Sequence, residues 1–218
     1  MHRREWLRMI AAYGAAGASG IVAEALAKGD VPPGIHRLDG TATVNGRAAQ
    51  VGTTVQVGDR VATGPKSQAV VVVGSDAFLM RAQTEIEIKG GRDGTLSDML
   101  IASGKVLSVF SKKPVAIKAA TASIGIRGTG AYIEIEPDHV YFCLCYGEAV
   151  VAGPGMQDKP VKTTHHEQPL LLRSDGGVLN ALPGPFRNHS DDELILLESL
   201  VGREPPFMKD GTYPAKKY

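Results

Sequence analysis

The sequence has little cysteine, few aromatic residues and almost no net charge. It contains two cysteines and one tryptophan among 218 residues, aromatic residues make up 6%, and the formal net charge is +1. Two cysteines cannot build the disulfide framework that stabilises small secreted domains. A nearly neutral chain without blocks of like charge has no electrostatic reason to bind nucleic acid or anionic lipid. The sequence therefore predicts no nucleic-acid partner and no cystine-rich scaffold.

The motifs of common catalytic chemistries are also missing. The chain has no Gly-x-Ser-x-Gly elbow, no His-Glu-x-x-His pair, no Walker loop and no dinucleotide fingerprint after a strand. The glycine-rich stretch at 125–130 leads into a strand-like run rather than a helix, so it predicts a tight turn and no anion site. We therefore expect a protein that is not an enzyme.

Long apolar runs are absent, but the first 27 residues have the composition of an export signal. Three arginines among the first eight residues precede an uncharged stretch at 9–23. This stretch is shorter than the roughly 20 residues that a membrane-spanning helix needs. Small residues at Ala25 and Ala27 then provide a cleavage site after residue 27. No transmembrane helix is expected in the mature chain.

The residues Arg3, Arg4, Trp6 and Leu7 resemble the twin-arginine export motif, with His2 where a serine is usual. The resemblance implies a signal of that type and a periplasmic or secreted mature protein. An ordinary secretory signal that contains two arginines and a retained N-terminal anchor are alternative interpretations.

The body of the chain has the pattern of many short strands. Between 41 and 173, β-branched runs alternate with Gly, Asn, Asp and Pro, and turns recur about every 8–12 residues. Asn45-Gly46 lies between two such runs and predicts a hairpin turn. Residues 85–89 alternate strictly between charged and apolar side chains, which indicates one buried face. The predicted fold class is all-β, a single antiparallel sandwich- or roll-like domain.

One amphipathic α-helix is predicted near the C-terminus. Ser190 and Glu193 form a capping box, and apolar residues follow at helical spacing until Gly202. We expect a helix over 191–201, docked on the sheet or on a partner. The expected divisions of the chain are a signal at 1–27, a linker at 28–39, a β domain at 40–153, an extension of strands and loops at 154–189, the helix region at 190–202 and a tail at 203–218.

The β domain resembles the FecR type. The matching positions are Gly58, Asp59 and Gly64 near its start, Gly128 and Thr129 before a later strand, and Gly147 near its end. The resemblance covers about residues 40–153 and implies a domain of short strands that works outside the cytoplasm. Founding members of that family regulate sigma factors through a cytoplasmic helical domain and a transmembrane helix. This chain has only a signal before the β domain, so that regulatory role does not carry over to it alone.

A pair of cysteines and a pair of histidines form the one unusual constellation. Cys143 and Cys145 would lie on the same face of a strand, and a disulfide between such positions is strained. Thiolates together with imidazoles are ligands for zinc or copper, so Cys143, Cys145, His165 and His166 are candidate metal ligands. A strained or intermolecular disulfide and two inert buried thiols are the alternatives.

Three functions follow from these features. The first is a non-enzymatic, exported FecR-like protein that acts as a binding, scaffold or sensory module for an envelope partner. The second is a metal-binding or redox protein that uses the Cys-x-Cys strand with the His-His segment. The third is the periplasmic arm of a signalling system, which would require a separate membrane protein.

Overall fold

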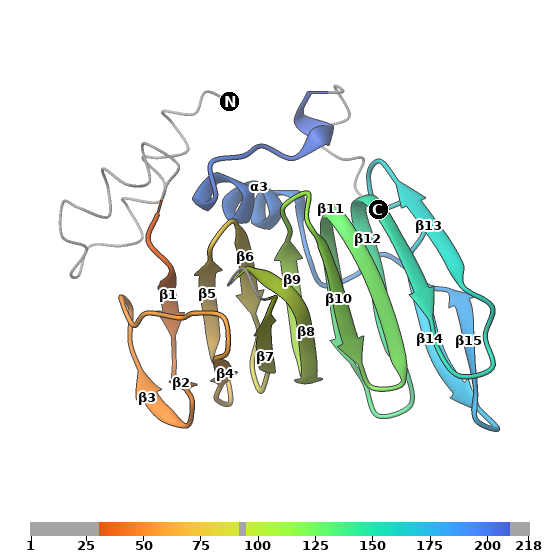
Figure 1. Ribbon diagram of the computed structural model, residues 1–218, viewed down its shortest axis with the longest axis horizontal. Helices are drawn as coiled ribbons and strands as arrows, with labels where there is room; N and C mark the ends of the chain where they lie inside the picture. Colours follow the sequence, from red (N-terminus) through yellow and green to blue (C-terminus); the bar gives the residue numbers. More distant parts are fainter. Residues whose placement is uncertain (1–30, 92–94, 210–218) are drawn as a thin grey trace.

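The computed structural model describes residues 31–91 and 95–209, which form 15 strands, one α-helix and one 3-10 turn (Figure 1). Arg3, Arg4, Trp6, Leu7, Ala25 and Ala27, on which the predicted signal depends, lie outside the described residues. The strands are β1 (Gly34–Asp39), β2 (Ala42–Val44), β3 (Arg47–Ala49), β4 (Arg60–Thr63), β5 (Gln68–Val73), β6 (Asp76–Met80), β7 (Glu85–Gly90), β8 (Leu96–Ser103), β9 (Lys105–Val109), β10 (Pro114–Ala119), β11 (Ala122–Ile135), β12 (Val140–Ala152), β13 (Lys159–Thr163), β14 (Leu170–Asp175) and β15 (Val178–Pro183).

The two long strands β11 and β12 fold the sheet into two layers. The first half of β11 pairs with β10 and its second half with β9, while β12 pairs with β14 near its start and with β13 near its end. The register between β11 and β12 shifts around Gly130, where both strands turn from one layer into the other. Side chains such as Val71, Phe78, Ile88 and Ile117 fill the core between the layers.

This architecture confirms the all-β fold class with one C-terminal helix. The strands β8 and β10 differ from the purely antiparallel expectation, because they pair in parallel from Asp98 and Ala116 onward. The strand between them in the chain, β9, lies in the other layer, where it pairs with β6 and β11. The chain therefore reverses twice before it returns beside β8, and a strand that returns through such a crossover runs parallel.

The range 28–39, expected to be a linker, contains strand β1 paired with β5. A register shift between Ile35 and Arg37 interrupts the alternation of buried and exposed residues along this strand. Because sequence analysis of strands depends on that alternation, the pattern of β1 was hidden. The sheet also continues beyond residue 153 through β13, β14 and β15.

The helix α3 (Asp191–Leu200) lies on the outer face of the layer that contains β6 and β9 (Figure 1). Both hydrogen bonds of the capping box between Ser190 and Glu193 are present. Leu194 and Leu197 are fully buried against this face, and the 3-10 turn η1 (Pro206–Met208) adds Phe207 to the same apolar cluster. Among the described residues, no helix is long and apolar enough to cross a membrane.

The helix contact predicts a clear stability difference between two leucines. Leu197→Ala removes a fully buried side chain and should lower the free energy of unfolding by about 2–5 kcal/mol. Leu182→Ala, at a side chain that is 48% exposed, should change it by less than about 0.5 kcal/mol. Urea denaturation of the two variants measures both values, and equal losses would contradict the packing described.

Candidate metal centre

Strand β12 directs both thiols toward the C-terminal part of the chain. Cys143 and Cys145 face the outer apolar cluster, whereas Phe142 and Leu144 face the core between the layers. Both cysteines are free and fully buried. The expected placement of the two sulfurs on one face of a strand is therefore what the structure shows.

The turn between β13 and β14 brings His166 to the cysteines. The backbone N–H of His166 donates a hydrogen bond to the carbonyl oxygen of Cys145 at 2.9 Å. The Glu167 carboxylate stiffens this turn, because it accepts hydrogen bonds from the backbone N–H groups of Thr164 and His165. The imidazole of His166 thus lies directly over the two thiols.

The fourth group, His189, comes from the segment that precedes α3. Its ring stacks on Tyr132 with centroids 4.5 Å apart, and its Nδ1 lies 2.7 Å from the carbonyl oxygen of Arg187. His189 was not among the predicted ligands, because it lies 44 positions from Cys145 and has no metal-binding spacing around it. No local pattern in the sequence indicates it, because the path of the chain before α3 brings it to the cysteines.

The four side chains present their ligand atoms to one point. Cys143 Sγ lies 3.6 Å from His166 Nδ1, Cys145 Sγ lies 3.5 Å from His189 Nε2, and the two imidazole nitrogens are 3.2 Å apart. A tetrahedral zinc ion, with bonds of about 2.3 Å to sulfur and about 2.0 Å to nitrogen, separates two nitrogen ligands by about 3.3 Å and a sulfur from a nitrogen by about 3.5 Å. The donor set and these three separations therefore fit a tetrahedral ion.

Hydrogen bonds on the far side of each ring orient both imidazoles. His166 Nε2 lies 3.1 Å from Asp191 Oδ1, and His189 Nδ1 lies beside the Arg187 carbonyl oxygen. When these far nitrogens carry the protons, His166 Nδ1 and His189 Nε2 face each other as two acceptors. The thiols of Cys143 and Cys145, at 3.6 Å and 3.5 Å from these two nitrogens, are their donors when no ion is bound. Outer partners such as Asp191 and the Arg187 carbonyl oxygen are typical of histidines that bind metals.

The other predicted ligand, His165, lies outside this group. Its Nε2 is 2.8 Å from Asp191 Oδ1, and its ring stacks on Phe207 with centroids 4.5 Å apart. His165 and His166 both direct Nε2 toward Asp191 Oδ1, and His166 in addition places its Nδ1 3.6 Å from Cys143 Sγ. The structure thus brings together three of the four residues that the sequence suggested, with His189 as the fourth.

The two thiols have opposite tendencies to ionise. A hydrogen bond with Cys145, supported by His166 and His189, holds the pKa of the Cys143 thiol well below its usual value. Burial raises the pKa of the Cys145 thiol well above its usual value. Burial would lower the pKa of His166, but hydrogen bonds to Asp191 and Cys143 outweigh it and raise that pKa. A metal must therefore displace protons here, and its affinity should fall as the pH falls.

Cys143, His166 and Asp191 also lie in the order of a thiol, an imidazole and a carboxylate in a nucleophilic relay. Cys143 is fully buried, and His166 is 2% exposed. A nucleophile must reach its substrate, so the burial of this thiol argues against catalysis by it.

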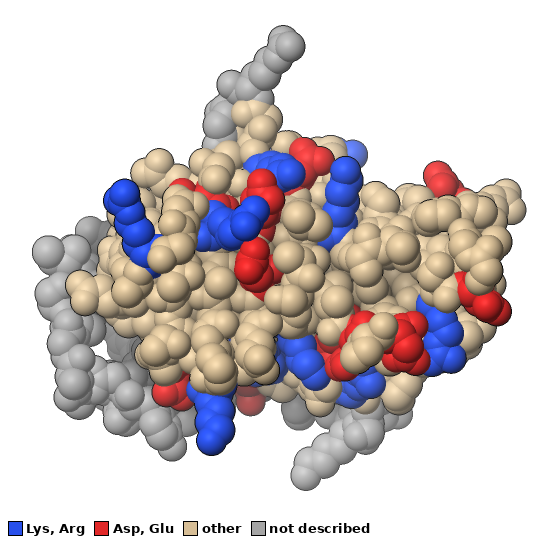
Figure 2. Space-filling view, turned by 90° about the horizontal axis from the view of Figure 1, so that it is seen from below, with Lys and Arg blue, Asp and Glu red and all other residues tan. Residues whose placement is uncertain are grey.

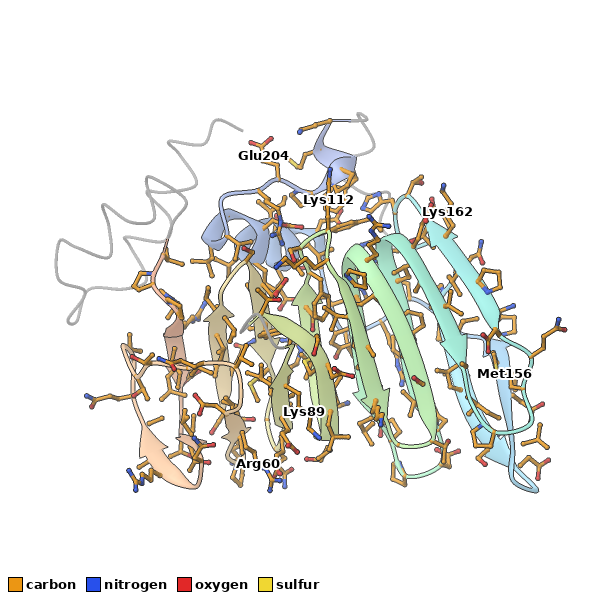
Figure 3. All side chains as sticks on the ribbon, viewed as in Figure 1. Arg60, Lys89, Lys112, Met156, Lys162 and Glu204 are labelled. Atoms are coloured by element: carbon orange, nitrogen blue, oxygen red, sulfur yellow. The ribbon has the colours of Figure 1, made fainter. Side chains whose placement is uncertain are left out.

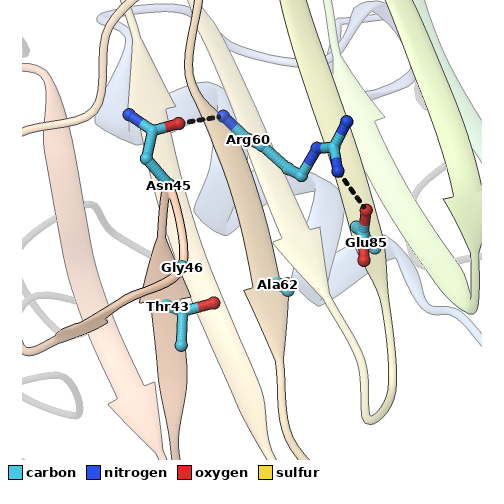
Figure 4. A pocket seen from close by; sticks show the side chains of 6 residues that line it. All are labelled: Thr43, Asn45, Gly46, Arg60, Ala62 and Glu85. Atoms are coloured by element: carbon cyan, nitrogen blue, oxygen red, sulfur yellow. Dashed lines mark hydrogen bonds and ion pairs between the residues drawn. The ribbon is translucent and has the colours of Figure 1, made fainter.

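The surface offers two hollows away from this cluster. One, of about 490 Å³, is lined by Thr43, Asn45, Gly46, Arg60, Ala62 and Glu85 (Figure 4). Its charged groups already have partners, because Arg60 pairs with Glu85 at 3.5 Å and its backbone N–H donates to Asn45. The other, of about 760 Å³, is a shallow, mostly apolar trough across β10 to β13. Neither contains a nucleophile with a base or a set of metal ligands among its described residues.

Many charged side chains of the described residues are exposed, whereas Glu134, Glu198 and Asp76 are buried. Figure 3 shows Arg60 and Lys89 near the lower edge of the sheet and Lys162 on β13 at its upper right. On the face seen in Figure 2, positive and negative side chains of the described residues lie next to one another without a broad area of one sign. This face therefore carries no broad basic patch of the described residues.

Comparison with known proteins gives only a distant likeness. No protein-family model matches the chain, and no curated protein matches it. Two crystal structures of a "putative anti-sigma factor" from Parabacteroides distasonis are similar in shape, with TM-scores of 0.49 and 0.48 and identities of 10% and 11%. The matches cover 65% and 66% of this chain and 73% and 74% of those chains. At this similarity, neither a family nor a function follows.

The geometry predicts that variants of His189 and His165 differ in zinc binding. His189→Ala removes one of the four converging ligand atoms and should abolish the binding of one zinc ion per chain at neutral pH. His165→Ala removes a hydrogen bond to Asp191 and should leave that stoichiometry unchanged. Elemental analysis of both purified variants measures the difference. Loss of zinc in His165→Ala with retention in His189→Ala would contradict the assignment.

Proposed function

We propose that this chain is a zinc-binding β protein of the cell envelope, with the ion held by Cys143, Cys145, His166 and His189. The observation that carries this proposal is the convergence of four ligand atoms within 4.8 Å of one another, at separations that match a tetrahedral ion. Two thiols and two imidazoles are a donor set that zinc prefers.

The centre has the character of a structural rather than a catalytic site. Four protein ligands complete a tetrahedron, whereas a catalytic zinc ion keeps one position for water or substrate. All four residues are also buried. The ion would therefore join parts of the chain and would not activate a substrate.

Zinc is favoured over copper by the number and arrangement of the donors. Copper(I) shares the preference for thiolates, and copper binds more tightly than zinc to most sites of this kind. Four donors at tetrahedral separations nevertheless match the preferred geometry of zinc. Metal supply decides the competition in the cell, so the metal must be identified in protein taken from its own compartment.

The decisive experiment is elemental analysis and thiol counting on protein purified without oxygen. We expect one zinc ion per chain and two thiols that become reactive only after chelation and unfolding. Cobalt(II) substitution should give the visible absorption of a tetrahedral centre with thiolate ligands. The Cys143→Ser, Cys145→Ser double variant should lose both signals. A metal-free native protein that binds neither zinc nor cobalt would overturn the proposal.

A broader role as an exported FecR-like binding or sensory module is part of the proposal. Its support is the motif at Gly128, Thr129 and Gly147, which has a physical role at the corner of β11 and β12. Gly147 has φ of +98°, and a Cβ atom there would lie 2.7 Å from the Thr129 methyl carbon and 2.9 Å from the Gly128 carbonyl oxygen. Only glycine fits there without a shift. The alternative is a role as the periplasmic arm of a signalling system.

The proposed export route rests on Arg3 and Arg4 and can be tested directly. Replacing both with lysine keeps the charge of the segment but removes the paired arginines of the twin-arginine motif, so the protein should remain in the cytoplasm as a precursor. Arg8→Lys should be exported normally. Fractionation of cells that express each variant measures the result, and export of the double variant at the normal level would contradict the proposed route.

A further inference from the structure

The last part of the chain forms a strap, defined here as residues 184–209. It leaves the sheet after β15, crosses the outer face behind β11 and β12, and places α3 over β6 and β9 (Figure 1). Apart from the helix and the 3-10 turn, it contains no regular secondary structure, and it adds no strand to the sheet.

Side chains rather than backbone ladders hold the strap in place. Among the described residues, the one backbone–backbone hydrogen bond between the strap and the sheet runs from Gly184 N–H to the Pro169 carbonyl oxygen, at its very start. Ion pairs add to this, from Arg187 to Glu134 at 2.7 Å and from Glu193 to Arg81 at 2.9 Å. A segment without ladder hydrogen bonds opens at a lower free-energy cost than a strand of the sheet.

The metal centre lies where the strap meets the sheet. Its ligands come from three separate segments, namely β12, the turn after β13 and the strap itself. His189 is the strap's contribution, and Asp191 at the start of α3 accepts hydrogen bonds from both His165 and His166. A metal bound there would link the strap directly to Cys143 and Cys145.

Without the ion, the same four side chains are joined only by hydrogen bonds among the imidazoles and the thiols. His166 Nδ1 and His189 Nε2 face each other at 3.2 Å above two buried thiols. Movement of the strap away from the sheet would give each imidazole access to water. Loss of the ion therefore lowers the free-energy cost of opening, because the bond from His189 to the ion no longer ties the strap to Cys143 and Cys145.

On the basis of the proposed zinc centre, we infer that the bound ion holds the strap against the sheet and thereby controls whether the strap covers it. Opening would uncover the apolar outer face of β6, β9, β11 and β12, which includes Leu79, Leu107, Tyr132 and Tyr146. Exposed apolar surface of this kind is what protein partners recognise. The availability of metal would thus decide whether this face is closed or open.

Hydrogen exchange measured by mass spectrometry on the full chain tests the inference. The zinc-loaded protein, the same protein after chelation and the chelated protein reloaded with zinc are compared. We expect amides of α3 to exchange at least about tenfold faster after chelation, while those of β5 and β9 stay protected, and reloading should reverse the change. His189→Ala should show fast exchange in α3 with or without zinc, and His36→Ala should behave as the unaltered protein.

The outcomes separate the inference from the proposed function. If the protein binds zinc but α3 exchanges equally fast with and without the ion, the inference about the strap is overturned and the proposed zinc centre is not. A protein that binds no zinc overturns both. If exchange rises throughout the sheet after chelation, the ion stabilises the whole fold. This outcome also overturns the inference that the ion controls the strap alone. Because the comparison uses the unaltered chain, it does not depend on the folding of any variant.

Discussion

The burial of β12 on both of its faces is the constraint on which the rest of the structure depends. One face of the run from Val140 to Tyr146 fills the core between the two layers, and the other would be exposed if the sheet ended the fold. An uncovered face of tyrosine and cysteine side chains in the middle of a sheet would be a large apolar patch. The helix α3 and the chain around it cover that face. The thiols are buried because this covering is complete.

The same constraint explains why polar groups near this face occur in tightly paired sets. Glu134 is fully buried, and its carboxylate meets Arg187, Asn188 and Tyr132 at 2.7 Å each. Glu198 likewise accepts hydrogen bonds from Tyr146 and Arg203. A buried carboxylate is tolerated only when such partners replace water. These sets fix the position of the covering segment on the sheet, and the stacking of His189 on Tyr132 is part of the same arrangement.

Local patterns in the sequence predicted those parts of the fold that depend on neighbours along the chain. The strand periods, the hairpin at Asn45-Gly46 and the capping box of Ser190 and Glu193 are of this kind. Strand β1 was hidden by its bulge, and the parallel pairing of β8 with β10 depends on which layer β9 enters. The residues of the metal centre likewise divide into those placed by local geometry and those placed by the path of the chain. Cys143 and Cys145 share a face because of local geometry, whereas His189 joins them only through the path of the chain across the sheet.

The complete enclosure of the two thiols has a kinetic consequence. Neither sulfur can meet an ion from solution while the covering segment stays in place, because both cysteines are fully buried. An ion held there would therefore enter and leave no faster than that segment opens, whatever the equilibrium affinity of the four ligands. The residence time of the ion would then be set by the opening rate of the segment that covers the thiols. A slow exchange with chelators would then measure local unfolding rather than the strength of the bonds.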